Sequence, residues 1–448
     1  MLGWLLAPRA AYSGELEFVR RFNADTESAV VKSADEKSDT SGVAMRWVAT
    51  GLLCLSVSTL LACDDTIESR RPLQGSGGTA GSAGGGANSG GDSPVGGSEA
   101  NGGAGGTFPF MLGADISSVD EEMHQGFTYQ DTDGTPKSIF DILKNHGFNF
   151  IRLRAFVKPS AMYGYDYGTG GGCIKSGSYC DTAHTVAVAQ AVKAAGMGIM
   201  LDLHYSDTWA DPGKQIIPED WRNASSVEQL AGYVQTYTHD FILAMLDAGA
   251  RPDIVQIGNE ITGGMLRDIP TNTTDCWGNS VTASAIGGSA SNWSDLAALL
   301  KAGAEGIKSV DSSIKIMLHI ENTQSPAGVV DWVTNASNQG VPFDVVGLSC
   351  YTVYQGPPSN WEAAFNALSD AFPTLSFVVA EYNGERTAAN TIIYNLPHGS
   401  GLGTFFWEPT VSGSWGGPAL FTANGSVKRA NVDDFAEFDT IAATVGLK

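Results

Sequence analysis

The strongest constraint on the fold of this chain is a repeat of eight short apolar runs between residues 110 and 408. Amphipathic helical patterns lie between several runs, for example at 185–196 and in the stretch that follows Trp293. The runs are 110–116, 149–156, 197–204, 253–259, 314–320, 344–350, 376–381 and 403–408.

Strands that are apolar along their whole length are typical of a parallel sheet that is buried on both faces. Eight strand–helix units in residues 107–448 therefore predict an α/β chain folded as a (β/α)8 TIM barrel with long βα loops. The alternative is a doubly wound open sheet, which we disfavour because no G-x-G-x-x-G motif follows the first run.

Polar residues stand at the ends of these runs, where buried strands would otherwise carry apolar residues or turn formers. In a barrel of this kind the chemistry lies at the C-terminal ends of the strands. Glu260 directly follows the fourth run and Glu381 ends the seventh, so their carboxyl groups can face each other across the mouth. A pair of facing carboxyl groups predicts glycoside hydrolysis. The other polar or aromatic ends are Asp115, Arg152, Arg154, His204, Asn259, His319, Tyr351, Trp407 and Glu408.

Five sequence blocks resemble glycoside hydrolase family 53, the endo-β-1,4-galactanases, and follow that family's order. The blocks are GADISS (113–118), YQDTDGTPKSIFDILKNHGFNFIRLRAFVKP (129–159), HYSDTWADPGKQ (204–215), IGNEITGGML (257–266) and FFWEPT (405–410). The resemblance implies retaining cleavage of β-1,4-galactosidic bonds in galactan or arabinogalactan, the side chains of pectin. It implies Glu260 as acid/base and Glu381 as nucleophile, with carboxyl groups about 5–5.5 Å apart.

The same resemblance implies roles for the neighbouring residues. Asn259 would donate to the sugar 2-hydroxyl, and Trp407 would stack on a pyranose face. Tyr351 and one of the arginines, Arg152 or Arg154, would hold Glu381 ionised. We expect the remaining substrate contacts from His204 and His319, which would touch the sugar or Glu260, and from Asp115, Asp207 and Trp209.

Three loops depart from the family pattern, so the glycan is less constrained than the reaction. They are SCYTVYQG (349–356), AEYNGERTAAN (380–390) and residues 163–181. One alternative is another β-1,4-glycanase of the same barrel clan. A second is a non-hydrolytic surface glycan-binding protein, against which the two carboxyl groups and Asn259 argue, because binding alone needs none of them.

The first hundred residues predict export. Residues 1–44 are an upstream extension without predicted structure, and residues 45–63 resemble a secretory signal that ends in the lipobox Leu60–Cys63. We expect Cys63 to carry a lipid, which would be the protein's only membrane attachment at the cell surface; the alternatives are a secreted protein or an uncleaved signal anchor. Residues 64–106 predict a disordered linker, because 15 of the 32 residues 75–106 are Gly. The catalytic domain is then 107–448.

The cysteines, one acidic turn and the net charge bear on disulfides, metal binding and partners. Cys173 and Cys180 predict a disulfide within one loop of an exported protein, whereas pairing of Cys276 with Cys350 stays open. Asp131–Gly134 resembles a fragment of a calcium loop but lacks its remaining ligands, so we expect no metal and no cofactor. The formal charge of −22 excludes nucleic acid as a partner. We expect a monomer that binds a polysaccharide.

Overall fold

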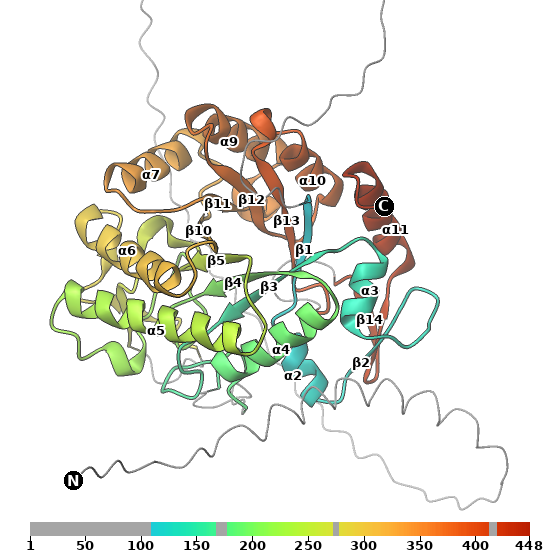
Figure 1. The fold of residues 1–448 in the computed structure, drawn as a ribbon, viewed down its shortest axis with the longest axis horizontal. Coiled ribbons are helices and arrows are strands. Elements are labelled where there is room, and N and C mark those ends of the chain that lie inside the picture. Colours follow the sequence, from blue (N-terminus) through green and yellow to red (C-terminus); the bar gives the residue numbers. More distant parts are fainter. Residues whose placement is uncertain (1–108, 167–176, 272–276, 412–418) are drawn as a thin grey trace, which may run out of the picture. The chain divides into compact units, whose positions relative to one another are not determined.

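The computed structural model describes residues 109–166, 177–271, 277–411 and 419–448 (Figure 1). Eight parallel strands close a barrel in the order β1-β13-β12-β11-β10-β5-β4-β3, with β1 also paired to β3. Each strand falls on one of the eight apolar runs, which confirms the predicted TIM barrel. The strands are β1 (Met111–Asp115), β3 (Phe150–Ala155), β4 (Gly198–Leu203), β5 (Ile254–Ile257), β10 (Lys315–Ile320), β11 (Val345–Ser349), β12 (Ser376–Tyr382) and β13 (Gly401–Trp407).

The major helices surround the barrel and cover the outer faces of its strands (Figure 1). Several begin at a side chain that caps the first turn: Ser138, Asp181 and Ser226 each accept a hydrogen bond from a backbone N–H three residues later. The helices are α3 (Ile139–Asn145), α4 (Thr182–Ala194), α5 (Val227–Asp247), α6 (Trp293–Val310), α7 (Pro326–Asn338), α9 (Pro358–Ala371), α10 (Arg386–Tyr394) and α11 (Val432–Thr444).

Shorter elements decorate the loops. The hairpin β14 (Phe421–Asn424) and β15 (Val427–Ala430) pairs with β2 (Thr128–Gln130). The β5–α6 connection holds two small antiparallel pairs, β6 (Gly264–Met265) with β9 (Gly288–Ser289) and β7 (Asp268–Pro270) with β8 (Val281–Ala283). The remaining short helices are α2 (Val119–His124), η1 (Glu219–Trp221), η2 (Ile261–Gly263), α8 (Thr352–Gln355) and η3 (Pro397–Gly399).

An apolar layer fills the N-terminal half of the barrel interior. Each strand contributes one of its side chains: Met111, Phe150, Met200, Ile254, Met317, Val345, Val378 and Phe405. Two residues further along several strands, the inward-facing positions are polar, as at Arg152, Asp202, Gln256 and His319. Because parallel strands share a direction, these polar side chains gather at the C-terminal mouth.

The predicted disulfide between Cys173 and Cys180 is wrong for this structure. Cys180 is a free, buried thiol whose Sγ lies 3.7 Å from the carbonyl oxygen of Ser117. Burial raises the pKa of Cys180 to about 12, so the thiol is unreactive. Cys350 is likewise free and buried, which leaves it unpaired with Cys276. Cys173 and Cys276 lie outside the described residues.

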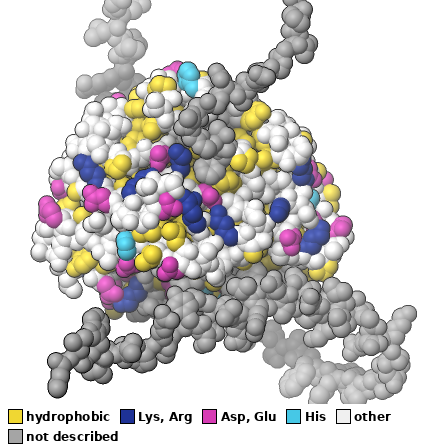
Figure 2. Space-filling view, in the orientation of Figure 1, with side chains coloured by type: hydrophobic (Ala, Val, Ile, Leu, Met, Phe, Trp, Pro, Cys, Tyr) yellow, Lys and Arg dark blue, Asp and Glu magenta, His cyan; other side chains and the backbone are white. Residues whose placement is uncertain are grey.

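The predictions for residues 1–106 also concern residues outside the described part: the extension 1–44, the signal with Cys63, and the linker 64–106. In the part that the structure describes, no helix is long and apolar enough to span a membrane. On the face in Figure 2, basic and acidic side chains are interspersed rather than gathered in a basic patch.

Helix α6 packs closely against α5 at Gly306. A Cβ added to Gly306 would lie 2.7 Å from Cβ of Thr238 and 2.8 Å from the carbonyl oxygen of Gln235. Gly306→Ala should therefore lower the free energy of unfolding by about 1–3 kcal/mol despite the better helix propensity of Ala.

Gly232 on α5 is exposed, with nothing within 4 Å of an added Cβ. Gly232→Ala should instead stabilise by about 0.5–1 kcal/mol. Thermal unfolding of both variants tests the contrast, and equal shifts would contradict it.

Candidate active site

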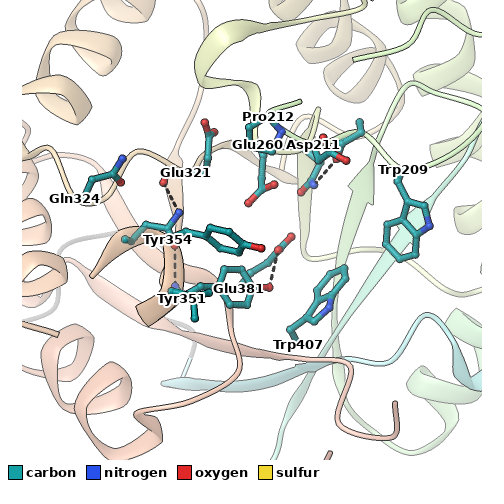
Figure 3. A pocket seen from close by; sticks show the side chains of 14 residues that line it. Trp209, Asp211, Pro212, Glu260, Glu321, Gln324, Tyr351, Tyr354, Glu381 and Trp407 are labelled. Atoms are coloured by element: carbon teal, nitrogen blue, oxygen red, sulfur yellow. Dashed lines mark hydrogen bonds between the residues drawn. The ribbon is translucent and has the colours of Figure 1, made fainter. Parts of the chain in front are cut away.

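A cleft of about 640 Å³ opens at the C-terminal ends of the barrel strands (Figure 3). Its described lining combines carboxylates, aromatic rings and amides, and within that lining there is no Lys or Arg. The lining residues are Trp209, Ala210, Asp211, Pro212, Asn259, Glu260, Glu321, Gln324, Tyr351, Val353, Tyr354, Gln355, Glu381 and Trp407. Such a surface suits an uncharged ligand that is rich in hydroxyl groups.

Glu260 follows β5 and lies partly buried in the cleft, where its carboxyl group points toward that of Glu381 (Figure 3). Its backbone is left-handed, with φ of 50°, a conformation that is costly for a residue with a side chain. The hydroxyl of Ser349 lies 2.7 Å from its Oε1. Burial raises the pKa of Glu260 well above its usual value, and the negative charges of Glu381 and Glu321 raise it further. Glu260 therefore holds a proton readily.

Glu381, near the end of β12, lies in a different environment. The phenol of Tyr351 donates to its Oε2 at 2.9 Å, and Nη1 of Arg152 lies 2.9 Å from its Oε1. Burial raises the pKa of Glu381, but the positive charge of Arg152 and the bond from Tyr351 oppose that increase. Burial and the charge of Glu381 also raise the pKa of Tyr351, which keeps its hydroxyl as a donor. The two carboxyl groups thus favour opposite protonation states.

Arg152 is the arginine that reaches Glu381. Its guanidinium is fully buried and also donates to Asp115 at 3.0 Å, to Asp202 at 2.8 Å and to Oδ1 of Asn259 at 3.0 Å. The charges of these carboxylates raise its pKa despite burial, so Arg152 stays a cation. Asp115 is completely buried beneath the cleft. Its predicted contact with substrate is therefore wrong, and it serves to anchor Arg152.

The second arginine, Arg154, forms an ion pair with Glu408 instead of Glu381. Its guanidinium carbon lies 4.2 Å from the ring centroid of Trp209 and 5.8 Å from that of Trp407. The two indoles line the cleft with their ring centroids 6.0 Å apart. The structure therefore corrects the role of Arg154, because the buried guanidinium lies behind the two indole rings.

Both predicted histidines lie beneath the cleft, buried away from a ligand. Nδ1 of His204 accepts from the backbone N–H of Ala210 at 3.0 Å, so its Nε2 carries the proton and donates to Asp202 at 3.0 Å. His319 lies between Asn259 and Ser349. The expectation that these rings touch the sugar or Glu260 is wrong, because their nitrogens are already engaged by buried groups.

Asp207 also lies away from the cleft. Its Oδ2 accepts from the backbone N–H of Glu219 at 2.7 Å, which ties the loop after β4 to η1. Burial raises the pKa of Asp207 to about 6. The side chain therefore stabilises the loop that carries Trp209, and its predicted substrate contact is wrong.

The sequence prediction missed several residues of the site, including Ser349, Glu321 and Tyr354. The hydroxyl of Ser349 forms a hydrogen bond with Glu260. Glu321, at the cleft wall, accepts a hydrogen bond from the hydroxyl of Thr262 at 2.6 Å. Tyr354 is 70% exposed and extends into the cleft (Figure 3). Ser349 lies at the end of β11, within the sixth apolar run, and Glu321 follows the fifth, so the rule that polar strand ends form the site could have found them. Among the described residues, no group of three His, Cys, Asp or Glu side chains is placed to hold a metal.

Known glycoside hydrolases are similar to this chain in sequence. A sequence profile of glycosyl hydrolase family 53 matches residues 111–392, which include both facing carboxyl groups. An arabinogalactan endo-β-1,4-galactanase from Thermothelomyces thermophilus is 31% identical over 337 residues, 66% of this chain and 88% of that protein. An endo-β-1,4-galactanase from Bacillus subtilis (strain 168) is 26% identical over 332 residues, 67% of this chain and 70% of that protein.

Two solved structures agree with this comparison. The family 53 catalytic domain of Ignisphaera aggregans superposes with a TM-score of 0.62 at 27% identity, covering 75% of this chain and 96% of that one. A fungal β-1,4-galactanase superposes with a TM-score of 0.59 at 28% identity, covering 73% and 98%. With the profile matched over most of the barrel, the chain belongs to glycosyl hydrolase family 53 and is a glycoside hydrolase.

Proposed function

We propose that this glycoside hydrolase cleaves β-1,4-galactosidic bonds in galactan and arabinogalactan, with retention of configuration at the anomeric carbon. The observation that carries the proposal is the pair of facing carboxyl groups in unlike environments. Burial and the charges of Glu381 and Glu321 favour the protonated form of Glu260, whereas Arg152 and Tyr351 favour the carboxylate form of Glu381. Double displacement requires one acid and one nucleophile in this arrangement.

In the first step, Glu381 attacks the anomeric carbon and forms a glycosyl ester, while Glu260 gives its proton to the departing glycosidic oxygen. In the second step, Glu260 takes a proton from water, whose oxygen attacks the same carbon and releases Glu381. Two inversions leave the configuration unchanged. The proton begins and ends on Glu260, so the enzyme is regenerated.

Substrate binding uses the cleft walls. Trp209 and Trp407 supply apolar faces for pyranose rings. The side-chain amide of Asn259 donates one hydrogen to the carbonyl oxygen of Ala210 at 2.9 Å, which leaves its second hydrogen for the sugar 2-hydroxyl. The named activities of the Thermothelomyces thermophilus and Bacillus subtilis relatives support β-1,4-galactan as the glycan.

Two exposed side chains in the cleft favour a second candidate glycan. Val353 and Tyr354, in the segment that departs from the family pattern, are each 70% exposed and line the cleft. A different set of side chains at a subsite changes which sugar hydroxyls are matched. Another β-1,4-glycan is therefore the alternative substrate, with the same two carboxyl groups in the same roles.

The activity test is release of reducing ends from β-1,4-galactan and a panel of other β-1,4-glycans. We expect release from galactan, and Glu260→Gln and Glu381→Gln should each lower kcat by about 10²–10⁴-fold or more, because each removes a reacting group. Glu362→Gln, an exposed position on α9, is the matched control and should leave kcat unchanged. Release from another glycan alone would overturn the substrate, whereas binding without any release would favour the non-hydrolytic glycan-binding protein.

The pH profile tests the assignment of the acid. Glu260 can act only while protonated, so activity is lost as the pH rises through its raised pKa. The negative charge of Glu321 contributes to that raised pKa. Glu321→Gln should therefore move the alkaline limb of kcat/KM to lower pH, with Glu362→Gln unchanged. An alkaline limb that stays in place or moves upward would contradict the assignment.

We also propose that the protein is exported and acts as a monomer near a membrane, held by a lipid on Cys63 and a glycine-rich linker. The lipobox Leu60–Cys63 and the composition of residues 75–106 support this arrangement. Mass spectrometry of the mature N-terminal peptide should find diacylglyceryl-modified Cys63 as the first residue. A mature protein that starts elsewhere, without lipid, would contradict it.

A further inference from the structure

A chain of hydrogen bonds leads from Glu260 into the barrel interior. Oε1 of Glu260 lies 2.7 Å from Oγ of Ser349, which lies 3.0 Å from Nε2 of His319. Nδ1 of His319 lies 2.8 Å from Oδ1 of Asn259. Ser349 and His319 are both 0% exposed, so bulk water cannot replace a missing partner. The double displacement described above leaves Ser349 and His319 without a role.

The orientation of Asn259 determines which nitrogen of His319 is protonated. The Asn259 amide nitrogen donates to the carbonyl oxygen of Ala210, and Arg152 donates to its Oδ1. The atom that faces Nδ1 of His319 is therefore an acceptor. Nδ1 must carry a hydrogen to bond it.

Gln256 is consistent with the same tautomer. Its Nε2 lies 3.2 Å from Nδ1 of His319, but it also donates to Oδ1 of Asp202 at 2.6 Å and to the carbonyl oxygen of Gly258 at 2.9 Å. These two bonds use both amide hydrogens. Burial, with the charge of Arg152, lowers the pKa of His319 well below its usual value, so the ring is neutral and its Nε2 is an acceptor.

Ser349 has one hydroxyl hydrogen and two acceptors within reach of it. We propose that Ser349 is a positioning residue whose hydroxyl follows the proton of Glu260. It donates to Nε2 of His319 while a proton on Oε1 of Glu260 points at Ser349, and it donates to Oε1 once the proton is on Oε2, the oxygen from which it passes to the glycosidic oxygen. The heavy atoms need not move, because rotation about the C–O bond of Ser349 is enough.

This inference rests on the proposed role of Glu260 as the acid. As the proton passes to the glycosidic oxygen, negative charge develops on Glu260 in a buried site. The hydroxyl of Ser349 turns to that charge and stabilises it, and hydrogen bonds to charged groups are stronger than neutral ones. Ser349 therefore accelerates the step in which Glu260 loses its proton, and its effect depends on how much the leaving group needs that proton.

The leaving group makes the test specific. β-1,4-Galactan departs as an alcohol and needs the proton, whereas the 2,4-dinitrophenyl glycoside of β-1,4-galactobiose departs as a stable phenolate and does not. Ser349→Ala should lower kcat/KM on galactan by about 10–100-fold and leave kcat/KM for dinitrophenolate release, which reports only the first step, within about threefold of wild type. Glu260→Gln should show the same selectivity with a larger loss on galactan.

A matched pair separates the hydroxyl from packing. Ser349→Thr and Ser349→Val have nearly the same shape and differ in the hydroxyl, so Thr should retain most galactan activity and Val should behave as Ala does. Equal losses on both substrates, or equal activity of the Thr and Val variants, would overturn the proposal. Wild-type enzyme that fails on galactan and on the dinitrophenyl glycoside would instead overturn the proposed function, whatever Ser349 does.

Discussion

The buried guanidinium of Arg152 is the interaction on which the active site depends. It joins β1, β4, the segment that follows β5, and β12 through Asp115, Asp202, Asn259 and Glu381. A buried cation is costly unless it is paired and hydrogen-bonded, and here its partners come from strands on different sides of the barrel. The closed barrel brings these partners together, and Arg152 in turn holds Glu381 and Asn259 at the floor of the cleft.

The difference between the two facing carboxyl groups follows from that arrangement. Glu381 lies against the positive charge of Arg152 and the phenol of Tyr351, whereas Glu260 lies against one hydroxyl and near the charges of Glu381 and Glu321. The same functional group therefore meets two unlike environments, one of which favours the carboxylate and the other the protonated acid. Burial raises the pKa of both groups, and the neighbouring charges make the difference between them.

The aromatic wall of the cleft is supported in a similar way. Arg154 is buried behind Trp209 and Trp407, and its charge is balanced by Glu408, the residue that follows Trp407. The backbone of Glu408 is left-handed, with φ of 43°, and its N–H donates to the carbonyl oxygen of Asp115 at 3.0 Å. The residue next to the indole is therefore anchored on two sides, which limits the orientations that Trp407 can adopt.

The sequence by itself determined the barrel, because eight apolar runs separated by helical patterns leave few other ways to bury their surface. It also determined which polar residues gather at the mouth, since all strand ends share one edge. Only the tertiary structure decided what each residue contacts: it assigned Arg152 to Glu381, Arg154 to Glu408, and His319 to Ser349. These partners lie on strands far apart in the chain, and their contacts depend on register, direction and burial.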